Sequence, residues 1–315
     1  MFSKKEESVF GREAIVVLLP FEYNLSSTLE CGQCFRHQLV VKNDEYVEYI
    51  IPVSNIIINV GQRKAGELIF YGATEGEFSS VIRQYFSLDT DFGSIKRDIV
   101  ERFDSEWLKR AAEYSGGIAI LKADPWEAVF SFIISQNNNI PRIRKIIREL
   151  CLAYGENLAE KRFKKCPLSI TDATPCQEAC SNCGCCYTFP KASAVAAEPD
   201  KMLASKPGFR YKYLLDAANK VSCGDISLET ICAEGTYTHT VECLKQIKGV
   251  GDKVAACAAL FGFGNLEAFP IDVWMKRAID KYFGGVLDPA DLGAYAGVAQ
   301  QYIFHYIRYL EGANT

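Results

Sequence analysis

Short runs rich in β-branched and aromatic residues alternate with polar turns in the first seventy residues. Such runs, four to eight residues long and bounded by turn-forming residues, are typical of β-strands. Asn43-Asp44 and Ala65-Gly66 fall where hairpin turns are expected. The pattern predicts an antiparallel sheet whose strands cover residues 13–19, 35–41, 45–51, 55–60 and 67–71.

The spacing of hydrophobic residues becomes helical after Thr74 and stays helical to the end of the chain. The segment Asp124-Pro125-Trp126-Glu127 has an N-cap, a proline at the first helical position and a glutamate at the third, so a helix should begin there. Gly116-Gly117 should end the helix before it. The predicted helices cover residues 78–86, 95–114, 125–135, 140–154 and 292–310, and helical patterns resume from Lys201 after an irregular stretch.

These patterns predict an α+β protein with two domains. Residues 1–115 would form an N-terminal antiparallel sheet domain with linking helices, and residues 116–315 a helical domain. A cysteine-rich segment at about 165–187 differs in composition from its surroundings and is expected to be an insertion.

Composition narrows the class of protein only slightly. The net charge is −4 and the isoelectric point is near 5.6, so the composition does not indicate a basic nucleic-acid-binding domain. A few local hydrogen-bond donors and helix N-termini can still bind a short duplex. The longest apolar run, residues 50–60, is too short to span a membrane. The N-terminus lacks a secretory signal, so we expect an intracellular protein whose 13 cysteines are in a reducing compartment.

Candidate chemistry is concentrated at residues 244–263, where Gly249-Val250-Gly251 separates two predicted helices. Glycines permit a tight turn and leave backbone amides exposed at a helix N-terminus, which suits phosphate binding. This arrangement is a helix-hairpin-helix. Lys253 lies in the first turn of the second helix, where the helix dipole disfavours the ammonium form, as a nucleophilic amine requires.

A carboxylate follows nineteen residues after this lysine, in Pro270-Ile271-Asp272-Val273-Trp274. Asp272 is placed to cap a helix over residues 273–283, and a carboxylate there could stabilise a cationic sugar. Taken singly, the hairpin fits a DNA clamp, the lysine a phosphate contact and the aspartate an ordinary cap. Their combination favours catalysis.

With these residues in place, the chain resembles the helix-hairpin-helix glycosylases that end in a glycine/proline-rich loop and an aspartate, and among them the 8-oxoguanine DNA glycosylases. Two further motifs lie outside the hairpin. They are Gly32-Gln33-Cys34-Phe35-Arg36, and Ser131-Phe132-Ile133 followed by Asn137-Asn138-Asn139-Ile140-Pro141-Arg142-Ile143. The match spans most of the chain.

The resemblance implies a role for each residue at a matching position. The carbonyl of Gly32 would accept the N7 hydrogen found only on the oxidised base, and Gln300 would bind its Watson–Crick edge. Phe304 and Cys257 would sandwich the flipped base. The widowed cytosine would be held by Asn137, Arg142 and Arg210, while Phe209 wedges into the stack and the amides of Gly249 and Gly251 bind phosphate. Without the motifs, each of these residues has an ordinary structural explanation.

The chain also departs from the family pattern. Lys248 stands where the hairpin usually has proline, Trp274 where relatives carry histidine, and Phe209 where tyrosine is common. Lys248 could add a phosphate contact. Trp274 puts in doubt one interaction with the DNA phosphate backbone. Neither Lys248 nor Trp274 replaces the nucleophile or the carboxylate.

The cysteine-rich insertion has no counterpart in the family. Its spacing, Cys176-x3-Cys180-x2-Cys183-x-Cys185-Cys186, offers more thiolates than a tetrahedral zinc needs. A structural zinc held by Cys176, Cys180, Cys183 and Cys186 is one hypothesis, and free or partly oxidised thiols are the other. An iron–sulfur cluster is disfavoured, because in related glycosylases its cysteines follow the catalytic region.

The predicted function is base-excision repair by a bifunctional glycosylase and abasic-site lyase. Lys253 would attack C1′ of the nucleotide carrying 8-oxoguanine, preferably opposite cytosine, and the resulting Schiff base would permit β-elimination. A Cys257 thiolate paired with a Lys253 ammonium is an open alternative for the resting site. We expect no catalytic cofactor, a monomer, damaged double-stranded DNA as partner, and a location in the prokaryotic cytoplasm or nucleoid or in the eukaryotic nucleus. The alternative functions are a glycosylase for another damaged purine and a non-catalytic DNA-binding protein.

Overall fold

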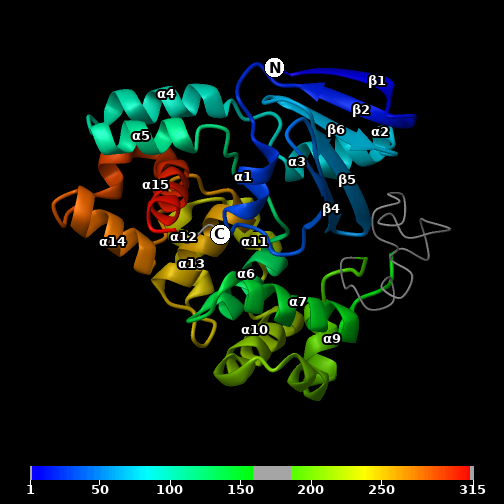
Figure 1. Cartoon of the computed structure of the whole chain (residues 1–315). Helices are drawn as coiled ribbons and strands as arrows, with labels where there is room; N and C mark the ends of the chain where they lie inside the picture. Colours follow the sequence, from blue (N-terminus) through cyan, green and yellow to red (C-terminus); the bar gives the residue numbers. More distant parts are fainter. Residues whose placement is uncertain (1, 159–185, 313–315) are drawn as a thin grey trace.

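A computed structural model describes residues 2–158 and 186–312. Its N-terminal part is a six-stranded antiparallel sheet in the order β1-β2-β6-β5-β4-β3 (Figure 1). The α+β class is therefore confirmed, and so are the five predicted strands, with ends shifted by up to three residues. The strands are β1 Ser3–Val9, β2 Arg12–Leu18, β3 Gln38–Lys42, β4 Val47–Val53, β5 Ile56–Gln62 and β6 Glu67–Tyr71.

The first strand, β1, was not predicted. Its sequence SKKEESV has no hydrophobic alternation, and only Val9 is buried. It pairs with β2 along its whole length, from Ser3 opposite Leu18 to Val9 opposite Arg12. Backbone pairing with β2, together with the ion pair between Lys4 and Glu75, thus holds a charged edge strand. Charged edges discourage pairing with other chains.

One predicted helix is wrong. Residues 95–114 form two helices, α4 (Phe92–Arg102) and α5 (Glu106–Tyr114). The break occurs because Ser105 adopts an extended conformation and its side chain accepts a hydrogen bond from the amide of Leu108 at 3.3 Å. A serine N-cap of this kind competes locally with helix continuation.

Two other helix boundaries also differ from the prediction. After the insertion, helical structure resumes at Ala192 rather than Lys201. The last helix starts at Ala296 rather than Leu292, because residues 289–295 form a 3-10 turn in which Gly293 has φ +69°. The helices predicted at 125–135 and 140–154 are confirmed at those bounds.

The remaining elements, in chain order, are mostly helices. They are α1 Leu25–Glu30, α2 Glu75–Glu77, η1 Phe78–Ile82, α3 Arg83–Tyr85, α6 Pro125–Ser135, α7 Ile140–Tyr154, α9 Ala192–Ala197, η3 Pro199–Ser205, η4 Gly208–Arg210, α10 Tyr211–Cys223, α11 Leu228–Glu234, α12 Tyr237–Leu244, α13 Asp252–Ala258, η5 Ala259–Phe263, α14 Val273–Tyr282, η6 Pro289–Tyr295 and α15 Ala296–Leu310. No helix in the described ranges is long and apolar enough to cross a membrane.

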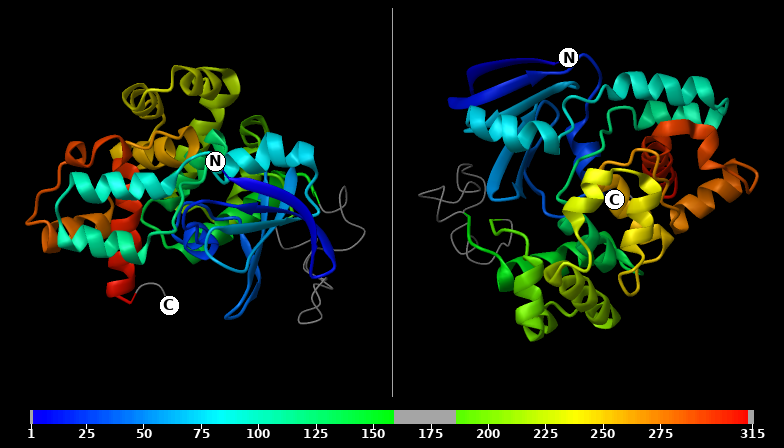
Figure 2. Two further views of the ribbon diagram at one scale, coloured as in Figure 1. Left: turned by 90° about the horizontal axis from the view of Figure 1, so that it is seen from above. Right: turned by 180° about the vertical axis from the view of Figure 1, so that it is seen from behind.

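The helices gather beside the sheet, with α15 against α5 and α14, and α13 against α6 (Figure 2). One continuous cluster of buried side chains runs from Ile15 in the sheet to Ile307 in the last helix. The loop after α1 meets α7 and α15 at Gly32, where a Cβ would lie 3.6 Å from Ile140 and 3.8 Å from Phe304. Residues from both ends of the chain are therefore brought to one place. The domain division at residue 115 stays a prediction.

Candidate active site

The predicted helix-hairpin-helix is confirmed: α12 ends at Leu244, and α13 begins at Asp252. Gly249 has φ +80°, and a Cβ there would lie 2.5 Å from the ring of Tyr213 on α10, so only glycine fits. The amide of Lys248 donates to Oδ2 of Asp216, also on α10, at 2.7 Å. These contacts hold the hairpin rigidly, with Gly251 exposed at the N-terminus of α13.

Lys253 lies in the first turn of α13, as predicted, and is half-buried. Its Nζ donates to Oγ of Ser135 at 3.3 Å and lies 5.6 Å from the ring centroid of Phe132. Both partners belong to α6. The amine is thus held across the gap between two helices.

Asp272 is the N-cap of α14, also as predicted. Its Oδ1 accepts hydrogen bonds from the amides of Trp274 at 3.0 Å and Met275 at 2.9 Å. Its Oδ2 has no hydrogen-bond partner among the described residues, so one carboxylate oxygen anchors the side chain and the other is available for chemistry.

A cavity of about 50 Å³ collects both groups and the four residues predicted to bind the base. It is lined by Cys31, Gly32, Phe132, Lys253, Cys257, Phe261, Pro270, Asp272, Gln300, Gln301 and Phe304. These residues come from the loop after α1, from α6, α13, η5 and α15, and from the loop before α14. Positions 32 and 304 in the sequence therefore share one wall.

Five lining residues were not predicted: Cys31, Phe132, Phe261, Pro270 and Gln301. Phe132 and Phe261 stack at 5.4 Å with an interplanar angle of 23° and resemble ordinary core residues in the sequence. Gln301 did leave a signal, because two consecutive glutamines interrupt an otherwise apolar run at 298–303. Phe261 lies in a π-helical turn, a feature frequent at functional sites.

Burial raises the pKa of the Cys257 thiol, with Asp272 acting in the same direction and Lys253 opposing it. Desolvation is the largest contribution, so the neutral thiol is favoured in the free protein. The sequence had left open a Cys257 thiolate paired with an ammonium. Burial therefore favours the thiol over that alternative, although the charge of Lys253 acts in the opposite direction.

The loop that carries Gly32 is held by its neighbours in the motif. Gly32 has φ +89°. Gln33 donates from Nε2 to the carbonyls of Thr28 and Ala119, both at 2.8 Å, and its Oε1 accepts from the amide of Leu121 at 2.8 Å. These hydrogen bonds of the buried Gln33 amide fix the loop beside Gly32.

The other end of the motif is attached to α6 and α7. Phe35 packs edge-on against Phe132 at 5.8 Å. Arg36 donates from Nη1 to Oε2 of Glu127 at 2.7 Å and from Nη2 to the carbonyl of Tyr187. Glu127 thereby links the loop to α6, so the motif residues after Gly32 act by positioning it.

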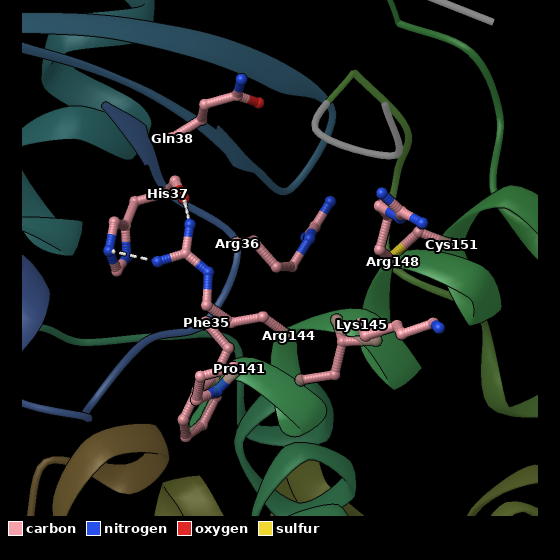
Figure 3. Close-up of a pocket in the computed structure, with 10 residues that line it drawn as sticks. Phe35, Arg36, His37, Gln38, Pro141, Arg144, Lys145, Arg148 and Cys151 are labelled. Atoms are coloured by element: carbon pink, nitrogen blue, oxygen red, sulfur yellow. Dashed lines mark hydrogen bonds between the residues drawn. The ribbon is translucent and has the colours of Figure 1, made fainter. Parts of the chain in front are cut away.

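A larger cavity of about 500 Å³ lies between Phe35 and the residues that follow it on one side and α7 on the other (Figure 3). There Arg144 donates to Nε2 of His37 at 3.0 Å and to its backbone carbonyl. Burial and this arginine lower the pKa of His37 to about 3, so the imidazole is neutral and can accept the bond. The cavity contains none of the predicted site residues, and Arg144 holds the loop to α7.

The four residues predicted to face the opposite strand lie at one end of α7. Asn137 and Arg142 are exposed, and Phe209 is 49% exposed with its ring 4.5 Å from the Arg210 guanidinium carbon. Arg210, in contrast, is only 2% exposed. Its donors bond the carbonyls of Gln136, Asn137 and Pro207.

The predicted zinc ligands Cys176, Cys180 and Cys183 lie outside the described residues. Cys186 is described and is buried. Within residues 2–158 and 186–312, no group of three or more potential ligands could hold a metal ion.

Comparisons with known proteins agree with this geometry. The family model for the N-terminal domain of 8-oxoguanine DNA glycosylases matches residues 16–129. The chain is 26% identical over 287 residues to an N-glycosylase/DNA lyase of Saccharomyces cerevisiae, covering 81% of this chain and 67% of the yeast protein. It is 23% identical over 306 residues to the N-glycosylase/DNA lyase OGG1 of Arabidopsis thaliana, covering 90% and 77%.

Two solved structures match over nearly the whole chain. The structure of MBOgg1 in complex with a low-affinity DNA ligand has a TM-score of 0.80 and 30% identity, covering 99% of each chain. The 8-oxoguanine glycosylase/lyase of Clostridium acetobutylicum, bound to double-stranded DNA with cytosine opposite 8-oxoguanine, has a TM-score of 0.79 and 29% identity, covering 99% of this chain and 98% of that one.

Proposed function

The chain belongs to the 8-oxoguanine DNA glycosylase/lyase family, and on that premise we propose which of its residues bind the lesion and cut the strand. The protein is a bifunctional DNA glycosylase and lyase of base-excision repair whose partner is DNA containing 8-oxoguanine. One observation carries the residue assignment. Lys253 and Asp272 line the same cavity as Gly32, Gln300 and Phe304.

We propose that the cavity receives the flipped base. The Gly32 carbonyl would accept the N7 hydrogen of 8-oxoguanine, and Gln300 would bind the Watson–Crick edge. Phe304 would stack on one face of the base and Cys257 would contact the other. A neutral thiol suits that contact, because it adds no charge against the base. The cavity is small in the free protein, so its lining has to separate as the base enters.

The chemistry follows from the choice of an amine nucleophile. The unprotonated Nζ of Lys253 attacks C1′, and the C1′–N9 bond breaks with its electron pair leaving on the base, which then takes up a proton. Oδ2 of Asp272 stabilises the positive charge that develops on the sugar. Ring opening gives an imine, which acidifies the C2′ hydrogen, so loss of that proton expels the 3′ phosphate. These steps use only side chains of the protein and no cofactor.

The opposite strand would be held at the N-terminus of α7. A guanidinium has five N–H donors, and four donor contacts of Arg210 already go to backbone carbonyls. Arg142 and the Asn137 amide have no hydrogen bond from their side chains to described residues. We therefore assign the main contacts with the opposite cytosine to Arg142 and Asn137, and to Arg210 the task of holding the carbonyls of residues 136 and 137 in place.

The hairpin would bind the backbone of the lesion strand. The amides at Gly249 and Gly251 lie at the N-terminus of α13, where partial positive charge favours a phosphate. The exposed Lys248 is beside them. A structural zinc in the cysteine-rich insertion remains a separate hypothesis, and metal analysis of the purified protein tests it: less than one equivalent of zinc would refute it.

Borohydride trapping tests the assignment of the nucleophile. A duplex with 8-oxoguanine opposite cytosine should form a covalent adduct with the native protein, whereas a guanine duplex should not. Lys253→Gln should abolish the adduct. Lys248→Gln, which removes another lysine of the same hairpin, should still form the adduct at saturating protein concentration, because it weakens only phosphate binding. An adduct that persists in Lys253→Gln would refute the assignment, and excision of alkylated purines in place of 8-oxoguanine would indicate a different substrate.

A further inference from the structure

Gln300 and Gln301 are consecutive on α15, and both are buried, with exposed fractions of 3% and 4%. Both also line the base cavity. The residues on either side of the pair, such as Ala299 and Tyr302, are buried too. Burying two amides in such a helix is costly unless their hydrogen bonds are made, so their bonding is informative.

The two side-chain amides form a hydrogen bond with each other, and one amide oxygen of the pair has no hydrogen-bond partner. Nε2 of Gln301 donates to Oε1 of Gln300 at 2.7 Å, which fixes the two side chains as one unit. Oε1 of Gln301 is buried and has no hydrogen-bond partner. A buried acceptor at the edge of a cavity without a partner points to a ligand that supplies the missing donor.

The unit offers a definite set of bonding positions to a base. Nε2 of Gln300 is a donor, Oε1 of Gln300 has a second lone pair, and Oε1 of Gln301 is a free acceptor. The Watson–Crick edge of guanine presents one acceptor, O6, and two donors, N1–H and the N2 amine. The one donor and two acceptors of the glutamine pair therefore match the one acceptor and two donors of guanine. Adenine has a single donor group and no 2-amino group on this edge, so it would leave an acceptor of the pair unpaired.

We propose that Gln301 is a second specificity-determining residue for the base, which orients the Gln300 amide and supplies the acceptor for the exocyclic N2 amine. This inference rests on the proposed function and deepens it, since it assigns recognition of the edge to two residues. It separates the two recognition tasks of the cavity: Gly32 identifies the oxidised side of the base, and the glutamine pair identifies it as a guanine.

The test pairs a protein change with the matching substrate change. Single-turnover base release is measured for 8-oxoguanine and for 8-oxohypoxanthine, which lacks only the N2 amine, both opposite cytosine, with the native protein and with Gln301→Leu. Gln301→Leu should release 8-oxoguanine about tenfold more slowly, as expected for one lost hydrogen bond in a desolvated site. Because the partner of the amine is gone, the ratio of the two substrate rates should fall about tenfold as well.

Three controls keep the outcome interpretable. Cleavage of a preformed abasic site needs no base, so Gln301→Leu should retain it, which also shows that the variant is folded. Tyr302→Phe removes another buried, unpartnered polar atom from α15 outside the cavity lining, and should change neither rate nor ratio. Gln301→Met, which keeps the length of the side chain, serves if the leucine variant does not fold, and should behave alike.

The possible failures are distinct. If the native protein releases no 8-oxoguanine, the proposed function fails. If the native protein is active and both Gln301 variants keep its rate and its substrate ratio, the inference about Gln301 is overturned. A slower variant with an unchanged ratio would also overturn it, because a purely structural role for Gln301 would slow both substrates equally.

Discussion

Nζ of Lys253 donates a hydrogen bond to Oγ of Ser135, which joins the start of α13 to the end of α6 at 3.3 Å. The same serine hydroxyl donates to the carbonyl of Phe132 at 2.8 Å, so its lone pairs are turned toward the lysine. Ser135 was not among the predicted site residues. It bonds the amine of Lys253 but does not line the base cavity.

Ser135→Ala should therefore slow adduct formation by roughly fivefold, corresponding to about 1 kcal/mol for one hydrogen bond. The reason is that the amine loses its fixed position while remaining able to react. Borohydride trapping under single-turnover conditions measures the rate. Ser131→Ala, one helical turn earlier on α6, should leave the rate unchanged. An equal loss in both variants would mean that α6 is perturbed as a whole.

Asp272 combines a structural and a chemical task that two substitutions can separate. Asp272→Asn keeps an oxygen that can accept from the amides of Trp274 and Met275, but it removes the charge. Asp272→Ala removes both. Asparagine should cut the rate of base release by at least about 100-fold with little change in thermal stability, whereas alanine should in addition cost about 1 kcal/mol of unfolding free energy.

Single-turnover kinetics and thermal melting measure these two effects for Asp272. Wild-type activity in Asp272→Asn would contradict a role for the carboxylate charge. Equal melting temperatures for the asparagine and alanine variants would contradict a contribution from the cap.

Arg142 and Arg210 are both predicted to serve the opposite strand, yet their surroundings differ. Arg210 is buried and bonded to three carbonyls, while Arg142 is exposed. Arg142→Ala should leave stability unchanged and reduce the preference for cytosine opposite the lesion by about tenfold. Arg210→Met should destabilise the fold by about 1–3 kcal/mol or more, because it leaves buried carbonyls unpaired.

Base release opposite each of the four bases, together with urea unfolding, distinguishes the two arginines. Loss of cytosine preference in Arg210→Met without loss of stability would show that Arg210 changes its bonds when DNA binds.

Stability should fall in mild acid because of His37. Its pKa is lowered to about 3 in the folded protein, mainly by burial, against about 6.5 in the unfolded chain. Between these two values the unfolded state binds more protons, so the free energy of unfolding decreases as pH falls from about 6.5 toward 3. The slope should approach about 1.4 kcal/mol per pH unit.

Urea unfolding at pH 7 and pH 5 measures this effect. The glutamine in His37→Gln cannot be protonated but can still accept the hydrogen bond from Arg144. The free energy of unfolding should therefore depend less on pH, by about 1.4 kcal/mol per pH unit. His239→Gln, which removes a partly exposed histidine of α12 that pairs with Glu234, controls for removal of a histidine. An unchanged pH dependence in His37→Gln would assign the acid sensitivity to other groups.

Features that depend on residues close together in the sequence could be predicted from it. Asp124 and Asp272 both cap the helices that follow them, because a cap needs only a short polar side chain within three residues of an amide. The glycine hairpin and the first-turn position of Lys253 were found for the same reason. Family motifs extended these predictions to Gly32, Gln300 and Phe304, which lie together although nearly the whole chain separates them.

Features that depend on distant partners could not be predicted. Strand β1 is charged and exists through its pairing with β2. The break at Ser105 is different, because its cap is local and a continuous helical pattern across it favoured one helix. Phe261 has no distinguishing sequence pattern, and Phe132 was noted only as part of a family motif. Packing alone places both rings in the cavity wall. The sequence assigned Arg210 to the opposite cytosine, whereas in the structure its guanidinium donates to the backbone carbonyls of residues 136 and 137.

The sequence by itself thus determined the fold class, the caps, the hairpin and the candidate catalytic pair, because each follows from local geometry or a contiguous motif. The tertiary structure decided which side chains share the cavity, which donors are already in use and which acceptor is left unpaired. Those are properties of atoms brought together from distant positions, since hydrogen-bond satisfaction is settled only when every neighbour is in place.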